Sequence, residues 1–213
     1  RTGDISPRTN PMADLPDSAD IIIIGGGAIG LSTACHLGWR GAENVLLLER
    51  HQLTSGTSWH AAGIIGPLRA TMNLTKLSTY AIEAFERLER ETGQSTGYRQ
   101  TGGFWLTSST DRMTELKRIA DLGLLAGLDA HILEPGEIKA RLPMLETADL
   151  TGSMWVEQDG QANPVDVCMA YARAARSHGV TIAENTAVAT VRTTAGAVHS
   201  VELADGRTIR CRA

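Results

Sequence analysis

Residues Asp20–Gly30 read DIIIIGGGAIG, and this stretch decides the fold. Its first half is a short β-branched apolar run that stops at a glycine, which is typical of a central parallel strand covered on both faces. Its second half places Gly25, Gly27 and Gly30 in the order G-x-G-x-x-G. Apolar residues at helical spacing follow, so the sequence predicts a strand, a tight glycine turn and a helix.

This glycine turn has the features of a pyrophosphate site. Gly25 permits the sharp bend, Gly27 lets the backbone approach a pyrophosphate, and Gly30 lets helix and strand pack closely. Ala28 and Ile29 begin the helix, where unpaired N–H groups and a partial positive charge attract the same group. The turn therefore predicts a dinucleotide site.

A second strand is expected at 45–48, and Glu49 follows at its carboxyl end. A carboxylate in this position can accept hydrogen bonds from ribose hydroxyl groups. Strand, glycine turn, helix, strand and acid thus occur in the order of a dinucleotide-binding α/β domain. The alternative, a purely structural glycine turn, requires neither the second strand nor its acid.

The composition is that of a soluble globular protein, with 42% hydrophobic and 21% charged residues. The 213 residues suffice for one large domain or one and a half smaller ones. Lys and Arg number 20 against 24 Asp and Glu, without a basic block, so nucleic acid is not an expected partner. No apolar run approaches the roughly 18 residues of a membrane span.

Cysteine and histidine spacing predicts no metal site. Three isolated cysteines, without a C-x-x-C pair, favour reduced core thiols over a disulfide framework or a zinc site. These are Cys35, Cys168 and Cys211. Three histidines also lack the spacing of metal ligands: His131, His178 and His199.

Residues 1–19 are expected to form a disordered leader. They contain Pro7, Pro11 and Pro16 among scattered polar residues and show no apolar period. Met12 is the favoured natural start, and the end of a targeting peptide is the alternative.

The segment after Glu49 carries a second motif. Residues 50–64 are rich in Gly, Ser and Thr, yet they contain Trp59 and His60 followed by three small residues. Together with the glycine turn and Glu49, the run Gly56–Gly63, GTSWHAAG, resembles the flavin-binding half of the dimethylglycine and sarcosine dehydrogenases. These are flavoproteins of the D-amino-acid-oxidase-like group.

The resemblance implies a Rossmann-like FAD-binding domain with a parallel sheet, and part of an antiparallel-sheet substrate domain. The FAD-binding domain would take 20–97 and 164–213, and the substrate domain 98–163. The chain would end before this fold is complete. Apolar periodicity and turn residues predict helices at 72–92, 111–127, from 134 to before 143, and at 165–178. They predict strands within 98–107, around Gly102 and Gly103, and at 131–133, 153–156, 180–183, 187–191, 198–203 and 208–211, with a turn-rich loop at 159–164.

By the same resemblance, the imidazole of His60 would be joined covalently to the 8α carbon of FAD, and the backbone of Val188 would meet the adenine. The expected cofactor-binding residues are Gly25, Gly27, Ala28, Ile29, Gly30, Glu49, Arg50, Gly56, Thr57, Ser58, Trp59, His60, Ala61, Ala62, Gly63, Ile64 and Val188. Trp105 and Trp155 are expected in the core, with the wall of a substrate pocket as the alternative.

The implied activity is FAD-dependent oxidation of the N-methyl group of a glycine derivative such as sarcosine or dimethylglycine. Tetrahydrofolate would be a further cofactor of the whole protein, and oxygen or an electron-transfer flavoprotein the electron acceptor. The catalytic residues are expected beyond residue 213, so residues 1–213 alone should be inactive. A reducing compartment is expected, either the bacterial cytoplasm or the mitochondrial matrix.

Three other functions stay open at this point. The first is a noncatalytic relative of the pyruvate dehydrogenase phosphatase regulatory-subunit type. The second is an amino-acid oxidase with noncovalent FAD. A NAD-binding module is the third, and it is disfavoured because it has no need of the Trp59–His60 motif.

Overall fold

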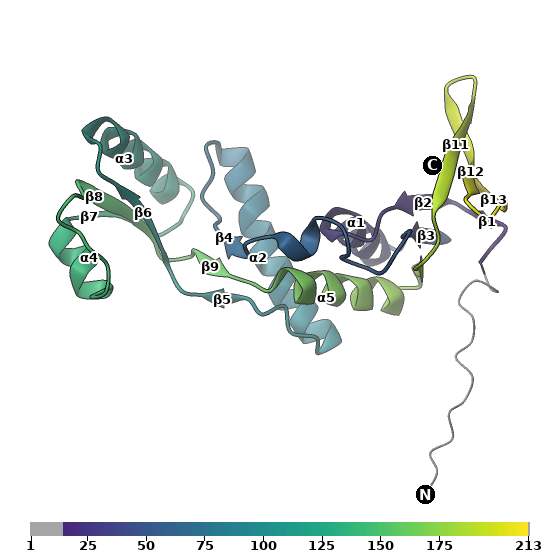
Figure 1. The fold of residues 1–213 in the computed structure, drawn as a ribbon, viewed down its shortest axis with the longest axis horizontal. Coiled ribbons are helices and arrows are strands. Elements are labelled where there is room, and N and C mark those ends of the chain that lie inside the picture. Colours follow the sequence, from purple (N-terminus) through teal and green to yellow (C-terminus); the bar gives the residue numbers. More distant parts are fainter. Residues whose placement is uncertain (1–14, 213) are drawn as a thin grey trace, which may run out of the picture. The chain divides into compact units, whose positions relative to one another are not determined.

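The computed structural model describes residues 15–212, which form two compact units. The first unit consists of residues 15–61, 91–94 and 164–212, and the second of residues 62–90 and 95–163. Figure 1 labels their helices and strands. Residues 62–90, expected in the FAD-binding segment, pack with the second unit. Within residues 15–212, no helix has the length and apolar character that crossing a membrane requires.

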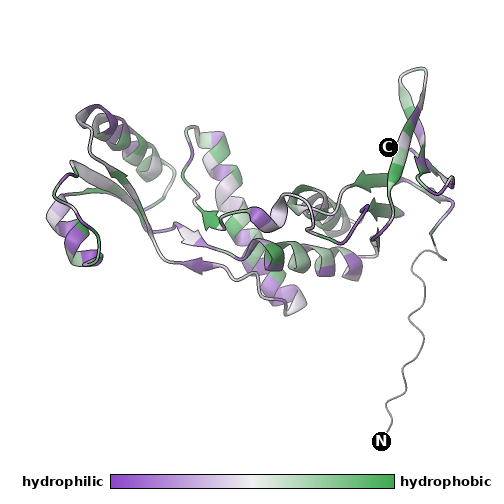
Figure 2. Cartoon of the chain, in the orientation of Figure 1, coloured by the Kyte–Doolittle hydropathy of each residue, from purple (hydrophilic) through white to green (hydrophobic). Residues whose placement is uncertain are grey.

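A parallel sheet organises the first unit. Its strands, in spatial order, are β10 (Thr181–Ala183), β3 (Val45–Leu48) and β2 (Ile21–Ile24). The glycine turn joins β2 to helix α1 (Ala28–Trp39), which packs against both β3 and helix α5 (Pro164–Ser177). The predicted α/β fold with a parallel sheet is therefore confirmed. Figure 2 shows the hydrophobic character of β2 and β3.

Strand β2 was expected to be central, and within residues 15–212 it lies at the edge of this sheet. Strand β3 lies between two neighbours and all four of its residues are buried. Strand β2 pairs with β3 alone among the described strands, and Ile24 at its end is 54% exposed. A β-branched apolar run indicates a strand, but the position of that strand in a sheet depends on pairing with distant segments.

The first unit also contains a second sheet, in the order β1 (Ser18–Ala19), β13 (Thr208–Cys211), β12 (Ala197–Leu203) and β11 (Val188–Thr194). Strands β11, β12 and β13 form an antiparallel meander, while β1 runs parallel to β13. Residues of this sheet share a hydrophobic core with Leu46 and Leu48 of β3.

Part of the expected disordered leader is ordered. Leu15 packs against the hydrophobic core of the first unit, and Ser18 and Ala19 form β1. Pairing with β13, distant in the sequence, orders these residues, and local composition carries no sign of it. Residues 1–14 lie outside the described part of the chain.

The second unit is built on an antiparallel sheet in the order β6 (Gly103–Thr107), β8 (Gly152–Val156) and β7 (Ala130–Leu133). All residues of the central strand β8 are buried. Helices α3 (Thr110–Leu125) and α4 (Pro135–Arg141) pack against β8, and α2 (Met72–Thr92) supplies residues of the same unit. This sheet confirms the expected antiparallel part of the fold.

A small second sheet consists of β4 (Ile64–Ile65), β9 (Gly160–Gln161) and β5 (Arg99–Gln100). The Gly102–Gly103 turn was expected to join two paired strands, but β5 pairs with β9, and β6 pairs with β8. The reason is that the N–H groups of Thr101 and Gly102 both donate to the carbonyl of Asp159, at 3.1 and 2.9 Å. The turn is thereby held to the loop at 159–164, in which strand β9 was not predicted.

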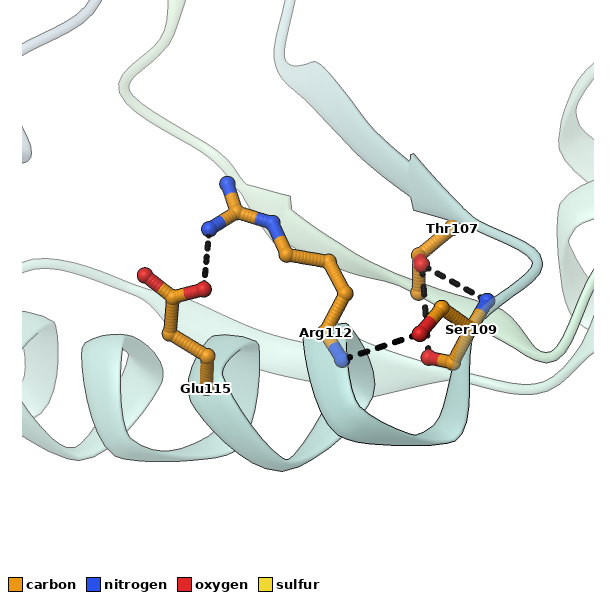
Figure 3. Close-up of polar contacts among 4 residues, drawn as sticks. All are labelled: Thr107, Ser109, Arg112 and Glu115. Carbon is orange, nitrogen blue, oxygen red and sulfur yellow. Dashed lines mark hydrogen bonds and ion pairs between the residues drawn. The ribbon is translucent and has the colours of Figure 1, made fainter.

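The start of α3 is fixed by side-chain caps (Figure 3). Ser109 Oγ accepts a hydrogen bond from the Arg112 N–H, and Thr107 Oγ1 accepts one from the Ser109 N–H. The guanidinium of Arg112 pairs with the carboxylate of Glu115 one turn along the helix. Arg112 is therefore already paired within its own helix.

Candidate functional site

The glycine turn between β2 and α1 has a backbone that only glycine fits at two positions. Gly25 has φ +112°, a value that side chains disfavour, and its N–H donates to the Leu48 carbonyl at 2.8 Å. A Cβ on Gly30 would lie 2.0 Å from the Gly25 carbonyl oxygen. Strand and helix can therefore approach each other only because Gly30 has no side chain.

The N-terminus of α1 has the chemistry of an anion site. Gly27 is its N-cap and supplies no side-chain cap. Among the described residues, the N–H of Ala28 has one acceptor, Ser58 Oγ at 2.9 Å, while the N–H groups of Ile29 and Gly30 have none. Ile29 is 86% exposed. These free donors and the helix dipole suit a pyrophosphate, so the residues present fit the expected nucleotide.

Glu49, at the carboxyl end of β3, holds the glycine turn. Its Oε2 accepts a hydrogen bond from the Gly26 N–H at 2.7 Å, and its Oε1 accepts one from the His51 N–H at 2.8 Å. Each carboxylate oxygen has a second lone pair, which can accept from a hydroxyl group. The carboxylate thus keeps acceptor capacity while it supports the turn, and the sequence did not indicate this supporting role.

The loop after Glu49 is held by the segment that follows β10. Thr186 N–H donates to the Glu49 carbonyl and Asn185 N–H to the His51 carbonyl, both at 2.8 Å. Asn185 has φ +55°, a left-handed conformation that Asn tolerates. Val188 begins β11 three residues later and is half-buried. Residues 185–188 are therefore brought beside the loop that Glu49 opens, which no short motif in the sequence indicates.

Ser58, Trp59 and His60 form a single 3₁₀ turn, η1. The rings of Trp59 and His60 are in contact in a tilted arrangement, with centroids 3.8 Å apart and planes at 33°. Both side chains are exposed. The motif that the sequence singled out is therefore a surface turn that presents an imidazole against an indole.

Ser58 connects η1 to two helices of the first unit. Its Oγ accepts from the Ala28 N–H at the start of α1, and its side chain is also hydrogen-bonded to the thiol of Cys168 in α5. Burial raises the pKa of the Cys168 thiol, and the bond to Ser58 opposes this rise. Nothing in the sequence around Cys168 indicates that its thiol interacts with Ser58.

Not all predicted cofactor residues fall in one unit. Arg50, Gly56, Thr57 and Ala61 are exposed residues of the first unit. Ala62, Gly63 and Ile64 belong to the second unit, where the Gly63 carbonyl accepts from the Ala162 N–H at 2.8 Å and Ile64 begins β4.

The second unit contains a pocket of about 360 Å³ with a buried acid in its wall. Asp159 is 6% exposed, and its Oδ2 accepts from the indole N–H of Trp105 at 3.0 Å. Burial raises the pKa of Asp159, opposed by this hydrogen bond and by the charge of Arg69. Trp105 thus lines a pocket, the alternative to the core position expected for it, whereas Trp155 is buried in the core.

Metal-ligating clusters are not found in the part of the chain that the structure describes, residues 15–212. None of the three cysteines forms a disulfide within residues 15–212, and Cys35 and Cys168 are buried while Cys211 is half-buried.

Several known proteins are similar to this chain. The family model DAO, FAD dependent oxidoreductase, matches residues 20–213. Mouse mitochondrial sarcosine dehydrogenase is 39% identical over 85% of this chain and 20% of its own length. The mouse mitochondrial pyruvate dehydrogenase phosphatase regulatory subunit is 36% identical over 93% of this chain and 22% of its own. L-proline dehydrogenase from P. horikoshii matches with a TM-score of 0.86 and 25% identity, over 93% of this chain and 52% of that structure.

The chain therefore spans about a fifth of the length of these curated relatives. The family match covers both units, from the first strand of the parallel sheet to the end of the chain. The resemblance seen in the glycine turn, Glu49 and the Trp59–His60 motif is confirmed. The chain belongs to the DAO family of FAD-dependent oxidoreductases.

Proposed function

We propose that the whole protein oxidises the N-methyl group of a glycine derivative, of the sarcosine or dimethylglycine type, with FAD bound by residues of this chain. The observation that carries the proposal is the hydrogen bond from the Ala28 N–H to Ser58 Oγ. It joins the pyrophosphate-binding turn to the motif that carries His60. A nicotinamide-binding domain needs the first of these parts and not the second.

Different residues of the first unit would bind different parts of the cofactor. The free N–H groups of Ile29 and Gly30 would hold the pyrophosphate, and Glu49 a ribose. The backbone of Val188 would meet the adenine. FAD, when bound, supplies the two-electron acceptor, whereas the chain binds, orients and tunes it.

We further propose that His60 binds the flavin covalently through a ring nitrogen. Neutral imidazole is a nucleophile near pH 7, and the side chain of His60 is exposed on a turn anchored by Ser58. Contact with the Trp59 ring restricts the orientation of the imidazole. The other motif residues of the first unit, from Gly56 to Ala61, would lie along the cofactor, since most are small.

The substrate would be a small N-methylated amino acid, with tetrahydrofolate as a further cofactor and oxygen or an electron-transfer flavoprotein as the acceptor. Sarcosine dehydrogenase, by its name, acts on such a substrate. The whole protein would work in the bacterial cytoplasm or the mitochondrial matrix. Residues 1–213 alone would be inactive, which an assay of sarcosine oxidation by the purified chain tests directly.

The test is flavin retention after denaturation of the full-length protein, measured by intact mass and by flavin fluorescence in a denaturing gel. Wild-type protein should retain flavin and His60→Ala should lose it. His51→Ala is the matched control, because His51 is an exposed histidine of the same loop and its hydrogen bonds to Glu49 and Asn185 use backbone atoms. Release of flavin from denatured wild-type protein would contradict the covalent link and favour a noncovalent amino-acid oxidase.

A noncatalytic, regulatory role is the second candidate. It is favoured by one observation, the 36% identity to the regulatory subunit of pyruvate dehydrogenase phosphatase. Flavin that is retained but not reduced by any N-methylated glycine under anaerobic conditions would support this role. Bleaching of the flavin absorbance by sarcosine or dimethylglycine would exclude it.

A further inference from the structure

Thr54, in the loop between Glu49 and the Trp59–His60 motif, has a strained backbone. Its φ is +68°, in the left-handed region that a β-branched side chain disfavours. Within residues 15–212, four non-glycine residues have a positive φ, and Thr54 is the only β-branched one among them. Thr54 is also buried, at 8% exposure. A conformation that the residue itself disfavours must be held by its surroundings.

The glycine turn holds the strained residue from one side. The Thr54 N–H donates to the Gly26 carbonyl at 2.9 Å. The preceding residue, Leu53, is buried, and its Cδ2 would lie 2.6 Å from a Cβ on Gly26. The loop can therefore lie against the glycine turn only because Gly26, which is not one of the three motif glycines, has no side chain.

Glu184 holds the loop from another element. Its Oε2 accepts a hydrogen bond from the Leu53 N–H at 2.9 Å, between positions 131 residues apart in the chain. Glu184 follows β10, directly before the two residues whose N–H groups bond the carbonyls of Glu49 and His51. Bonds to the loop thus occur at every second residue, and the third of them depends on a side chain.

The contacts of Glu184 suit this role. A carboxylate binds an N–H group more strongly than a neutral acceptor does. Its other oxygen, Oε1, lies 3.7 Å from Nη2 of Arg176, in the last turn of α5. This ion pair is long and partly exposed, so it contributes little. The bond to Leu53 is therefore the contact through which Glu184 acts on the loop.

The conformation of Thr54 bears on the motif that follows it. The two backbone dihedral angles of a residue set the direction of the chain after it. Four residues on, Ser58 begins η1 and bonds the Ala28 N–H. Relaxation of Thr54 to a negative φ would redirect the chain that leads to this turn.

We propose that Glu184 is a positioning residue for the flavin, which holds Thr54 in its strained conformation and so keeps the Trp59–His60 motif against the cofactor. Glu184 needs no contact with FAD for this, because it acts through the Leu53 N–H. All these residues belong to the first unit. The inference rests on the proposed flavin-binding role of the motif.

The experiment is fluorescence titration of the full-length apoprotein with FAD, in a His60→Ala background that forms no covalent link at this position. Glu184→Ala should weaken FAD binding at least about tenfold, since losing a charge-assisted bond lowers the population of the binding-competent loop. Glu184→Gln keeps an acceptor oxygen for the Leu53 N–H and should restore most of the affinity. Arg176→Met, which removes only the ion pair, should have little effect.

Glu202→Ala is the matched control. The Glu202 side chain is 35% exposed, against 34% for Glu184, and each is paired with an arginine. Glu202 lies on β12 and holds no part of the loop. Equal FAD affinities of folded Glu184→Ala and Glu202→Ala proteins would overturn the positioning role.

A substitution at Thr54 tests the mechanism itself. Asn tolerates a left-handed backbone, so the loop of a Thr54→Asn protein should depend less on Glu184. In this background, Glu184→Ala should lose most of its effect on FAD affinity. An undiminished effect would overturn the proposal that Glu184 acts by holding a strained residue.

The wild-type protein gives a measurement that does not depend on a variant folding. The Leu53 amide of the full-length protein with FAD should be protected from hydrogen exchange, and exchange at the rate of an open loop would contradict the proposal. The affinities themselves stand whether or not His60 binds flavin covalently. Wild-type protein that releases its flavin on denaturation would refute the covalent link alone, and the titrations would still decide the role of Glu184.

Discussion

Ser58 Oγ lies 2.9 Å from the backbone nitrogen of Ala28, so the turn that carries His60 is bonded directly to the first residue of helix α1. Ser58 and Ala28 are 30 residues apart in the chain. The bond fixes the imidazole-bearing turn relative to the site where a pyrophosphate would bind. The geometry of covalent attachment would therefore depend on a residue that need not touch the reacting atoms.

Ser58→Ala should reduce the fraction of protein that retains flavin after denaturation, with His60 still in place. Loss of one hydrogen bond costs about 1 kcal/mol of stability, which is too little to unfold the chain. Ser58→Thr keeps the hydroxyl and should restore attachment, whereas the exposed Ser55→Ala should have no effect. Full flavin retention in folded Ser58→Ala protein would show that the bond is dispensable for attachment.

Glu49→Ala should weaken FAD binding by more than tenfold in a His60→Ala background, where the flavin is free to dissociate. The carboxylate holds two backbone N–H groups, and each charge-assisted bond contributes about 1.5–3 kcal/mol when well formed. Fluorescence titration of the apoprotein with FAD measures the change. Glu43→Ala, an exposed acid before β3, is the control. Equal affinities in the two variants would contradict a ribose-binding role for Glu49.

Gly30→Ala should destabilise the protein by more than about 3 kcal/mol or prevent folding, because its Cβ would lie 2.0 Å from the Gly25 carbonyl oxygen. Gly136→Ala is the matched control in helix α4, where no atom lies within 4 Å of the added Cβ. There, alanine should be neutral or stabilising, since it is the better helix former. Urea denaturation of both variants makes the comparison. Equal stabilities would mean that strand and helix adjust without cost.

Asp159 predicts an unusual pH dependence of stability. Its pKa is raised in the folded protein above the ordinary value of 3.8, chiefly by burial. Between these two values the folded state binds more protons than the unfolded state, so the free energy of unfolding falls as pH rises through this window. Asp159→Asn should remove this fall and raise stability at neutral pH in the absence of ligand. Parallel stability curves for wild type and variant would contradict the raised pKa.

The parts of the fold that the sequence predicts are those determined by local patterns. The glycine turn, α1, β3 and Glu49 follow from the stretch 20–49, and apolar periodicity together with turn residues predicts the helices α2, α3, α4 and α5. The features of the fold that the sequence does not predict depend on pairing between distant segments. Strand β1 is ordered by β13, and the Gly102 turn is held by Asp159 and does not close a hairpin. Neither partner can be identified from spacing along one chain.

The residues of the candidate site can likewise be predicted from local motifs, whereas the contacts that orient them cannot. The family resemblance predicts His60 as a cofactor-binding residue, and the glycine motif predicts Ile29 and Gly30. The bonds that orient these groups, from Ser58 to Ala28 and Cys168, join positions with no shared motif. Asp159 lies in a loop whose sequence indicates only a turn, and its burial beside Trp105 appears once the strands of the second unit are assembled.

The contact between Gly103 and Asp159 makes strand β6 and the charge of the pocket depend on each other. Any side chain at position 103 would begin 2.4 Å from the Asp159 carboxylate oxygen and would displace the acid or the strand. In homologues with this backbone, a larger residue at that position would therefore mark, in the sequence alone, a pocket that has lost its buried negative charge. The residue at position 103 therefore indicates which ligands the pocket can bind.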